Sequence, residues 1–97
     1  MADITFQWDP RKSRANLAKH GISFEEAKTA FYDEAALLIS DPEHSESEDR
    51  FLMIGTSSAL RELVVSHCHR QNDGVIRIIS ARKATSQERR QYRAKSP

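Results

Sequence analysis

The sequence is poor in several residue types that particular classes of protein require. Its single cysteine, Cys68, excludes an internal disulfide and suits a reducing compartment. Its three glycines form no Gly-rich phosphate-binding loop, and no apolar run approaches the roughly 18 residues that span a membrane. The first residues lack the basic-then-apolar order of a signal peptide. We therefore expect a cytoplasmic protein that is not associated with a membrane.

The chain has 97 residues, for which we expect a single domain over residues 1–97. Its net charge is only +1, but the charge is unevenly distributed. Residues 21–60 contain two Lys or Arg and nine acidic residues, whereas residues 61–97 contain nine Lys or Arg and three acidic residues. The C-terminal part therefore has the charge of a surface that binds nucleic acid or a partner, unless folding mixes it with the acidic segment.

Local signals in the first third of the chain predict one strand and two helices. Residues 4–8 alternate apolar and polar side chains, which is typical of a half-buried strand. The pair Asp9–Pro10 then begins a helix, with the aspartate as N-cap, and Gly21 ends it. The segment Ser23–Glu26 has the sequence of a capping box, in which each side chain bonds to the other residue's N–H, so a second helix begins there.

The rest of the chain predicts four strands and a final helix. The strands are expected at residues 37–39, 50–54, 62–69 and 75–81, separated by turns at 55–59 and 71–74 and an acidic loop at 43–49. The first of these is expected to be short and buried, and the last to be central because it is apolar on both faces. The segment Thr85–Glu88 is a second capping box and begins a helix over residues 86–94, in which Tyr92 is the only large apolar residue.

This order of elements predicts an α+β fold. Two N-terminal helices and one C-terminal helix are expected on one side of an antiparallel sheet of four to five strands. Strict alternation along the last strand places Arg82 with Ile76, Ile78 and Ser80, and places Arg77 on the opposite face.

The run His67-Cys68-His69 is the only cluster that resembles a set of metal ligands. On a strand, the two histidines share one face while Cys68 points to the other, so three ligands from this run are not expected. We predict neither a metal ion nor any other cofactor.

Cationic side chains on the last two predicted strands and at their ends favour phosphate chemistry. They are His67, Arg70, Arg77, Arg82 and Lys83. Cleavage of RNA without a metal requires a base for the 2′-hydroxyl, an acid for the leaving 5′-oxygen, and cations for the charge that builds on the phosphate. Histidine suits proton transfer near neutral pH, and arginine binds two phosphate oxygens at once. A solvated surface explains the same residues equally well.

Several segments of the chain resemble the BrnT toxin family, in the same order and spacing from about residue 6 to residue 93. They are Phe6–Pro10 with Lys12 and Asn16, Lys19–Ala27, Phe31–Asp33, Arg50 with Ile54–Gly55, Leu63–Val65, and Arg77–Ala84 with Glu88, Arg89 and Tyr92. The runs Lys-His-Gly-Ile-Ser-Phe and Arg-Ile-Ile-Ser-Ala-Arg are the most specific of these segments.

The resemblance implies a fold similar to that of RelE-type toxins and an endoribonuclease that cuts RNA and inhibits translation. It also implies a partner, a ribbon-helix-helix antitoxin of the BrnA type, in an assembly of two toxins and two antitoxins. Promoter DNA would be bound only through that antitoxin.

RelE-like toxins differ in their catalytic residues, so the resemblance does not by itself assign the site. We expect Arg82 and Arg70 to bind phosphate, His67 and Tyr92 to transfer protons, and Lys83 to act as a further cation. The residues expected along the RNA path are Lys12, Lys19, His20, Arg61, Arg77 and Arg89. The alternative hypothesis is a non-enzymatic corepressor or inactive toxin-like subunit that only binds the antitoxin, because no unmistakable catalytic set is present.

Overall fold

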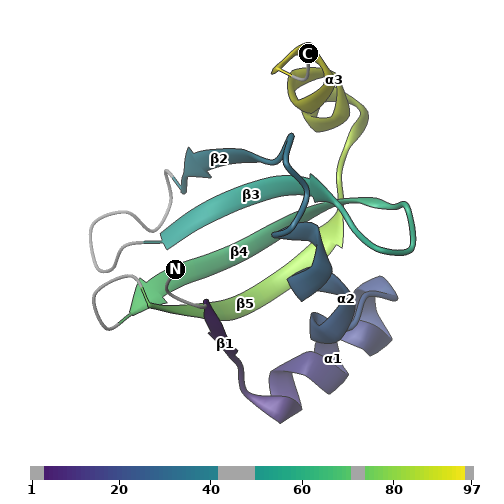
Figure 1. Ribbon diagram of the computed structural model, residues 1–97. Coiled ribbons are helices and arrows are strands. Elements are labelled where there is room, and N and C mark those ends of the chain that lie inside the picture. Colours follow the sequence, from purple (N-terminus) through teal and green to yellow (C-terminus); the bar gives the residue numbers. More distant parts are fainter. Residues whose placement is uncertain (1–3, 42–49, 71–73, 96–97) are drawn as a thin grey trace.

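A computed structural model describes residues 4–41, 50–70 and 74–95, whose arrangement is shown in Figure 1. In chain order the elements are β1 (Thr5–Gln7), α1 (Pro10–His20), α2 (Phe24–Ala30), β2 (Leu37–Ser40), β3 (Arg50–Thr56), β4 (Glu62–Arg70), β5 (Val75–Lys83) and α3 (Ser86–Lys95). This is the predicted order. The predicted loop at 43–49 and the turn residues 71–73 lie outside the described residues. None of the helices in the described ranges is long and apolar enough to cross a membrane.

The strands form one five-stranded sheet in the order β1-β5-β4-β3-β2. β1 lies parallel to β5, and the other neighbours are antiparallel. The α+β class is confirmed, and β1 makes the sheet mixed where only antiparallel pairing was expected. The prediction that residues 37–39 are buried is wrong, because β2 is an edge strand with a neighbour on one side only. Leu38 is 51% exposed and Ile39 is 37% exposed.

The helices cover opposite faces of the sheet, and Figure 1 shows α3 on the other side of the strands from α1 and α2. The core beneath α1 and α2 consists of Ile22, Phe24, Ala27, Ala30, Met53, Leu63, Val65, Ile78 and Ala81. A second cluster joins Ala84 and Tyr92 to Ile54 and Val64. The expectation that all three helices share one side is therefore wrong. Only two residues separate β5 from α3, and Ala84 and Tyr92 bury their apolar surface against the face that α1 and α2 leave uncovered.

We call the face covered by α1 and α2 the helix face, and the opposite one, which carries Val64, Ser66 and Cys68 of β4, the open face. Leu63 and Val65 belong to the core of the helix face, whereas Val64 belongs to the second cluster. Because side chains alternate along a strand, these residues define the two faces of β4.

The helix boundaries follow from the caps that the sequence predicted. The Asp9 carboxylate accepts a hydrogen bond from the Arg11 N–H at 2.8 Å, and Gly21 ends α1 in the left-handed conformation, with φ of 72°. The Ser23 hydroxyl accepts from the Glu26 N–H at 3.0 Å, as the capping box requires.

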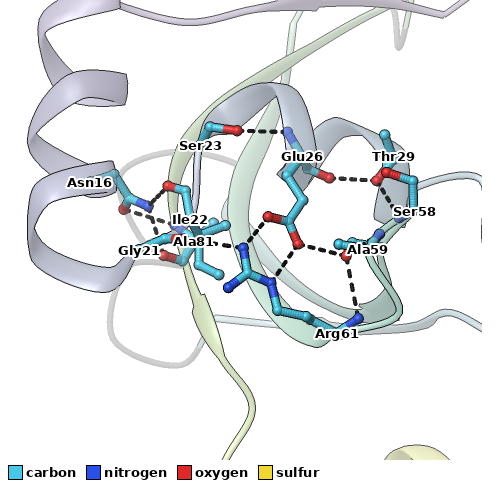
Figure 2. Close-up of polar contacts among 11 residues, drawn as sticks. Asn16, Gly21, Ile22, Ser23, Glu26, Thr29, Ser58, Ala59, Arg61 and Ala81 are labelled. Carbon is cyan, nitrogen blue, oxygen red and sulfur yellow. Dashed lines mark hydrogen bonds and ion pairs between the residues drawn. The ribbon is translucent and has the colours of Figure 1, made fainter.

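The second half of that capping box is not formed. The Glu26 carboxylate binds Arg61 and Ser57 of the β3–β4 loop, as Figure 2 shows for Arg61. The bond from Arg61 lowers the pKa of Glu26, so the carboxylate is held ionised. A tertiary partner with a full positive charge has taken the place of the local backbone N–H.

Gly55 allows α2 to pack closely on the sheet. It lies within β3, one residue before the strand ends, rather than in the predicted turn at 55–59. A Cβ at this position would lie 2.7 Å from the Ala30 carbonyl oxygen and 2.9 Å from the Met53 sulfur. Any larger residue would therefore push α2 away from β3.

One buried amide connects α1, the link between the helices, and β5. The Asn16 Nδ2 donates to the carbonyls of Ile22 and Ala81, both at 2.8 Å, and its Oδ1 accepts from the Ala81 N–H at 3.1 Å. Figure 2 shows these bonds converging on Asn16. Since buried polar groups need partners, this side chain satisfies three backbone groups that no strand or helix serves.

We expect the Asn16→Ala substitution to lower the free energy of unfolding by about 3 kcal/mol, because it leaves those backbone groups buried without partners. Urea denaturation monitored by circular dichroism measures this. Arg14→Ala, which truncates an exposed residue of the same helix, is the control and should change the stability by less than about 0.5 kcal/mol. Equal losses in the two variants would contradict the role of the amide.

Candidate active site

A shift in strand pairing decides which face of the sheet each predicted cation occupies. On β4 and β5, Ser66 pairs with Ser80, but His67 pairs with Ile78, so Ile79 is an extra residue on β5. Such a bulge leaves two residues of one strand opposite one residue of the other. Because the side-chain period of a strand is two, the extra residue moves every later side chain of β5 to the other face.

Arg77 and Arg82 therefore lie on the same face, and the alternation that predicted opposite faces is wrong. Arg77 pairs with Cys68 and Arg82 pairs with Val64, which are four residues apart on β4 and both belong to the open face. Arg50 of β3 also pairs with Cys68. Two strand spacings place the Cα atoms of Arg50 and Arg77 about 10 Å apart. The sequence alone indicates no role for Arg50, because only the pairing of β3 with β4 brings it to this face.

The open face also carries the polar end of β1. Arg77 donates from Nη1 to the Gln7 side-chain oxygen at 3.1 Å. The arginine is half-buried. Arg70 is the last residue of β4 and pairs with Val75. The side chain of Arg70 lies outside the described part of the chain.

Arg82 forms a two-pronged ion pair with Glu88 at the start of α3. Its Nη1 and Nη2 lie 2.7 and 2.8 Å from the two carboxylate oxygens. This pairing lowers the pKa of Glu88 to about 2 and raises that of Arg82. Glu88 also accepts from the Thr85 N–H at 2.8 Å, and the Thr85 hydroxyl accepts from the Glu88 N–H at 3.2 Å, so the predicted capping box is confirmed. The Arg82 side chain is still 40% exposed, so the guanidinium remains accessible to a phosphate.

His67 lies on the helix face, away from Arg77 and Arg82. It is 1% exposed and packs against Phe31, with ring centroids 4.8 Å apart, while its Nδ1 lies 3.1 Å from the Val65 carbonyl oxygen. Burial lowers the pKa of His67 to about 4. The structure therefore does not bring His67 together with the arginines that were expected to share its site.

Tyr92 is buried beneath α3, with its hydroxyl directed into the protein. The hydroxyl donates to the Asp33 carboxylate and lies 2.9 Å from the Thr56 hydroxyl. Burial, together with the Asp33 carboxylate, raises the pKa of Tyr92. These contacts connect α3 to Asp33 and to β3.

Three other predicted cations meet at the end of the sheet where β4 begins and β5 ends. Lys83, Arg61 and Arg89 line a shallow cavity of about 260 Å³, together with Leu60 and Glu62. Lys83 pairs with Leu63 and so belongs to the helix face, not to the face of its neighbour Arg82. This cluster adjoins the arginines of the open face, because Arg89 follows Glu88 on α3 and the Arg82 guanidinium donates to the Lys83 carbonyl at 3.3 Å.

The remaining predicted RNA contacts lie on α1. Lys12 is in its first turn and exposed, and Lys19 and His20 are in its last turn. Arg61 donates to the carbonyl of Gly21 at 3.1 Å, which brings the end of α1 close to the cavity that Lys83, Arg61 and Arg89 line (Figure 2). In the described ranges, no group of three or more His, Cys, Asp or Glu side chains is placed to hold a metal ion.

The open face can bind phosphate, and Glu88 places a carboxylate beside Arg82. The arginines Arg50, Arg77 and Arg82 supply positive charge. The Glu88 carboxylate binds Arg82 and so lies close to any phosphate that Arg82 holds. The sequence alone indicates no catalytic role for Glu88, because its contact with Arg82 depends on the turn from β5 into α3.

Comparisons with known proteins agree with this fold. The family described as the ribonuclease toxin, BrnT, of type II toxin–antitoxin systems matches residues 8–88. Among solved structures, that of the Brucella abortus ribonuclease toxin BrnT superposes with a TM-score of 0.66 and 24% sequence identity, over 86% of this chain and 99% of that one. No curated protein matches the chain.

The buried His67 predicts a pH-dependent stability. Its pKa is about 4 in the folded protein, against 6.5 for a histidine exposed to water, so between these values the unfolded state binds a proton that the folded state does not. The free energy of unfolding should therefore fall as the pH falls through this window, by up to about 3 kcal/mol. Denaturation of wild type and His67→Phe from pH 7.5 to 4 measures the difference. Parallel pH curves for the two proteins would show that His67 is not the cause.

Proposed function

The chain belongs to the BrnT family of ribonuclease toxins of type II toxin–antitoxin systems, and from this we propose that it is a metal-independent endoribonuclease that cleaves RNA on the open face and inhibits translation. The observation that carries the proposal is the placement of Arg77 and Arg82 on one face by the bulge in β5. Without that bulge, the two arginines would lie on opposite sides of the sheet.

The arginines of the open face are suited to hold the RNA backbone. The partners of Arg77 and Arg82 are four positions apart on β4, which corresponds to about 13 Å along the strand. Arginines with this separation can bind different phosphates of one RNA strand. In this proposal, Arg82 binds the phosphate at which the RNA is cleaved. We include Arg70, which follows Cys68 on β4 by two residues, as a further phosphate contact.

We propose that Glu88 is the base that takes the proton of the ribose 2′-hydroxyl. In the free protein it is a weak base, because its bond to Arg82 holds its pKa near 2. A phosphate that binds Arg82 competes for the same guanidinium, which raises the pKa of Glu88 towards its ordinary value. The carboxylate would then become a better base only when substrate is bound, and Arg82 would stabilise the charge on the phosphate in the transition state. The 2′-oxygen attacks the phosphorus, the bond to the 5′-oxygen breaks, and that oxygen takes a proton from water, which gives a 2′,3′-cyclic phosphate and a 5′-hydroxyl.

His67 and Tyr92 have structural roles in this proposal. The first is sealed on the helix face and the second is bound to Asp33 and Thr56. Lys83, Arg61 and Arg89 have no role in cleavage in this proposal, and they line the cavity described above.

A type II system implies a protein antitoxin. We propose that it is a ribbon-helix-helix protein of the BrnA type and that two toxins assemble with two antitoxins, with promoter DNA bound through the antitoxin. The resemblance of the sequence segments supports this proposal.

The first test concerns Arg82. Wild type expressed without antitoxin should arrest growth and generate new RNA ends, and Arg82→Ala should reduce cleavage at least about 10²-fold, because one donor to the transition state is lost. Mapping RNA ends in both strains and in Arg14→Ala, a control on the helix face, measures this. If folded wild type neither arrests growth nor makes new ends, the chain is a subunit that only binds the antitoxin.

The second test concerns Glu88. Glu88→Gln keeps an oxygen for the Thr85 N–H and for Arg82 but cannot take a proton, so we expect cleavage to fall about 10²- to 10⁴-fold while RNA binding persists. Cleavage of a labelled RNA by purified protein, next to binding by fluorescence anisotropy, separates the two effects. Cleavage at the wild-type rate would eliminate Glu88 as the base.

A further inference from the structure

The loop between β3 and β4 is fixed in one shape by side chains of α2. The Ser57 hydroxyl donates to Glu26 at 2.7 Å, the Ser58 N–H donates to the Thr29 hydroxyl at 2.8 Å, and Arg61 donates from Nε to Glu26 at 2.9 Å. Figure 2 shows this network around Glu26 and Thr29. A loop held in this way loses little conformational freedom when another molecule binds it.

Leu60 stands at the tip of this loop and is exposed to solvent. Its side chain is 84% exposed, the highest value among the exposed large apolar residues of the described part of the chain. Its φ of 62° lies in the left-handed region, where a residue with a side chain is sterically disfavoured, and it is the only non-glycine residue with positive φ in the described ranges. Strained backbone of this kind persists where the surroundings enforce it, and it is common at binding sites.

Two grooves meet at Leu60. One is the basic cavity of about 260 Å³ lined by Lys83, Arg61 and Arg89. The other, of about 440 Å³, is lined by the loop, Thr29, Asp33, Thr56 and Tyr32. Tyr32 is itself 64% exposed. We call the side chains of Tyr32, Leu60, Lys83 and Arg89 the Leu60 surface.

The charges on the Leu60 surface indicate the chemistry of its partner. Arg61 forms an ion pair with Glu26, whose pKa the Lys83 charge also lowers, and Glu62 of the same cavity pairs with Arg93. Among the described residues, no carboxylate forms an ion pair with Lys83, which is exposed, or with Arg89, which donates to the Ser86 hydroxyl at 3.3 Å. An apolar knob beside two such cations fits a segment that offers an apolar pocket bordered by carboxylates.

RNA and a second copy of the chain fit the Leu60 surface less well. A leucine at the tip provides neither the stacking nor the hydrogen bonds by which proteins bind single-stranded RNA. In a two-fold dimer, the same patch meets itself, so the Lys83 and Arg89 charges of both copies would be gathered in one interface.

We propose that the Leu60 surface is a docking site for an acidic, amphipathic segment of the antitoxin, and that it adjoins the cleavage site without including Arg82 or Glu88. The inference rests on the antitoxin that family membership implies, and not on the proposed roles of Arg82 or Glu88. Leu60 is the anchor, Tyr32 extends its apolar contact, and Lys83 and Arg89 pair with the carboxylates of the segment.

The decisive variant is Leu60→Gly. Glycine adopts positive φ without strain, so the variant should unfold at no lower temperature than wild type, while loss of the anchor should weaken binding about 30-fold. Titration calorimetry of the full chain with the antitoxin encoded with it measures the affinity. Leu17→Ala, which removes a 51% exposed leucine from α1, is the matched control and should bind like wild type.

A second pair of variants tests the charges. Lys83→Glu combined with Arg89→Glu should weaken antitoxin binding about tenfold or more at low salt and reduce its dependence on salt. Lys12→Glu, a charge reversal at an exposed position of α1, should leave the affinity unchanged.

RNA cleavage by the same proteins shows whether the Leu60 surface binds the antitoxin, RNA or a second copy of the chain. We expect Leu60→Gly to cleave RNA like wild type and to resist neutralisation by the antitoxin. Wild-type antitoxin affinity in both Leu60→Gly and the double charge variant would overturn the proposal. Loss of RNA cleavage with normal antitoxin binding would assign the surface to RNA, and loss of a chain dimer would assign it to a second copy. The affinity readout remains valid even if wild type cleaves no RNA.

Discussion

Between Ser66 and His67, the pairing of β4 with β5 shifts by one residue, and the distribution of charge over the molecule depends on this shift. With the extra residue Ile79, β5 turns Ile78 to the helix core and still brings Arg77 and Arg82 to the open face. A regular β5 would have forced one arginine beneath α1 and α2, where an unpaired charge is costly. The bulge thus lets one strand serve both an apolar core and a basic surface.

The helices are attached by polar side chains as much as by apolar contact. A chain of 97 residues has a thin core, and α3 contributes only Tyr92 to it as a large side chain. Asn16 attaches α1 to β5, Glu26 attaches α2 to the β3–β4 loop, and Tyr92 attaches α3 through Asp33. Each bond is buried or half-buried, so each also fixes the position of the element that carries it.

The same construction separates two basic regions that lie close together in the sequence. Arg82 and Lys83 are adjacent, yet alternation directs the first to the open face and the second to the Leu60 surface. The proposed cleavage site and the Leu60 surface therefore contain different cations. In the proposed arrangement the antitoxin binds the toxin without competing for Arg82, and α3, which carries both Glu88 and Arg89, connects the two regions.

Features that depend on neighbouring residues could be predicted from the sequence alone. The caps at Asp9, Ser23 and Thr85, the stop at Gly21 and the order of the elements were all predicted, because each depends on bonds within a few residues. The family, too, was recognised from short segments. The placement of β2 at the edge, the side taken by α3 and the pairing of Glu26 with Arg61 depend on contacts between distant residues. So does the face of each cation, since a bulge without a glycine leaves no mark in the sequence and yet inverts the alternation beyond it.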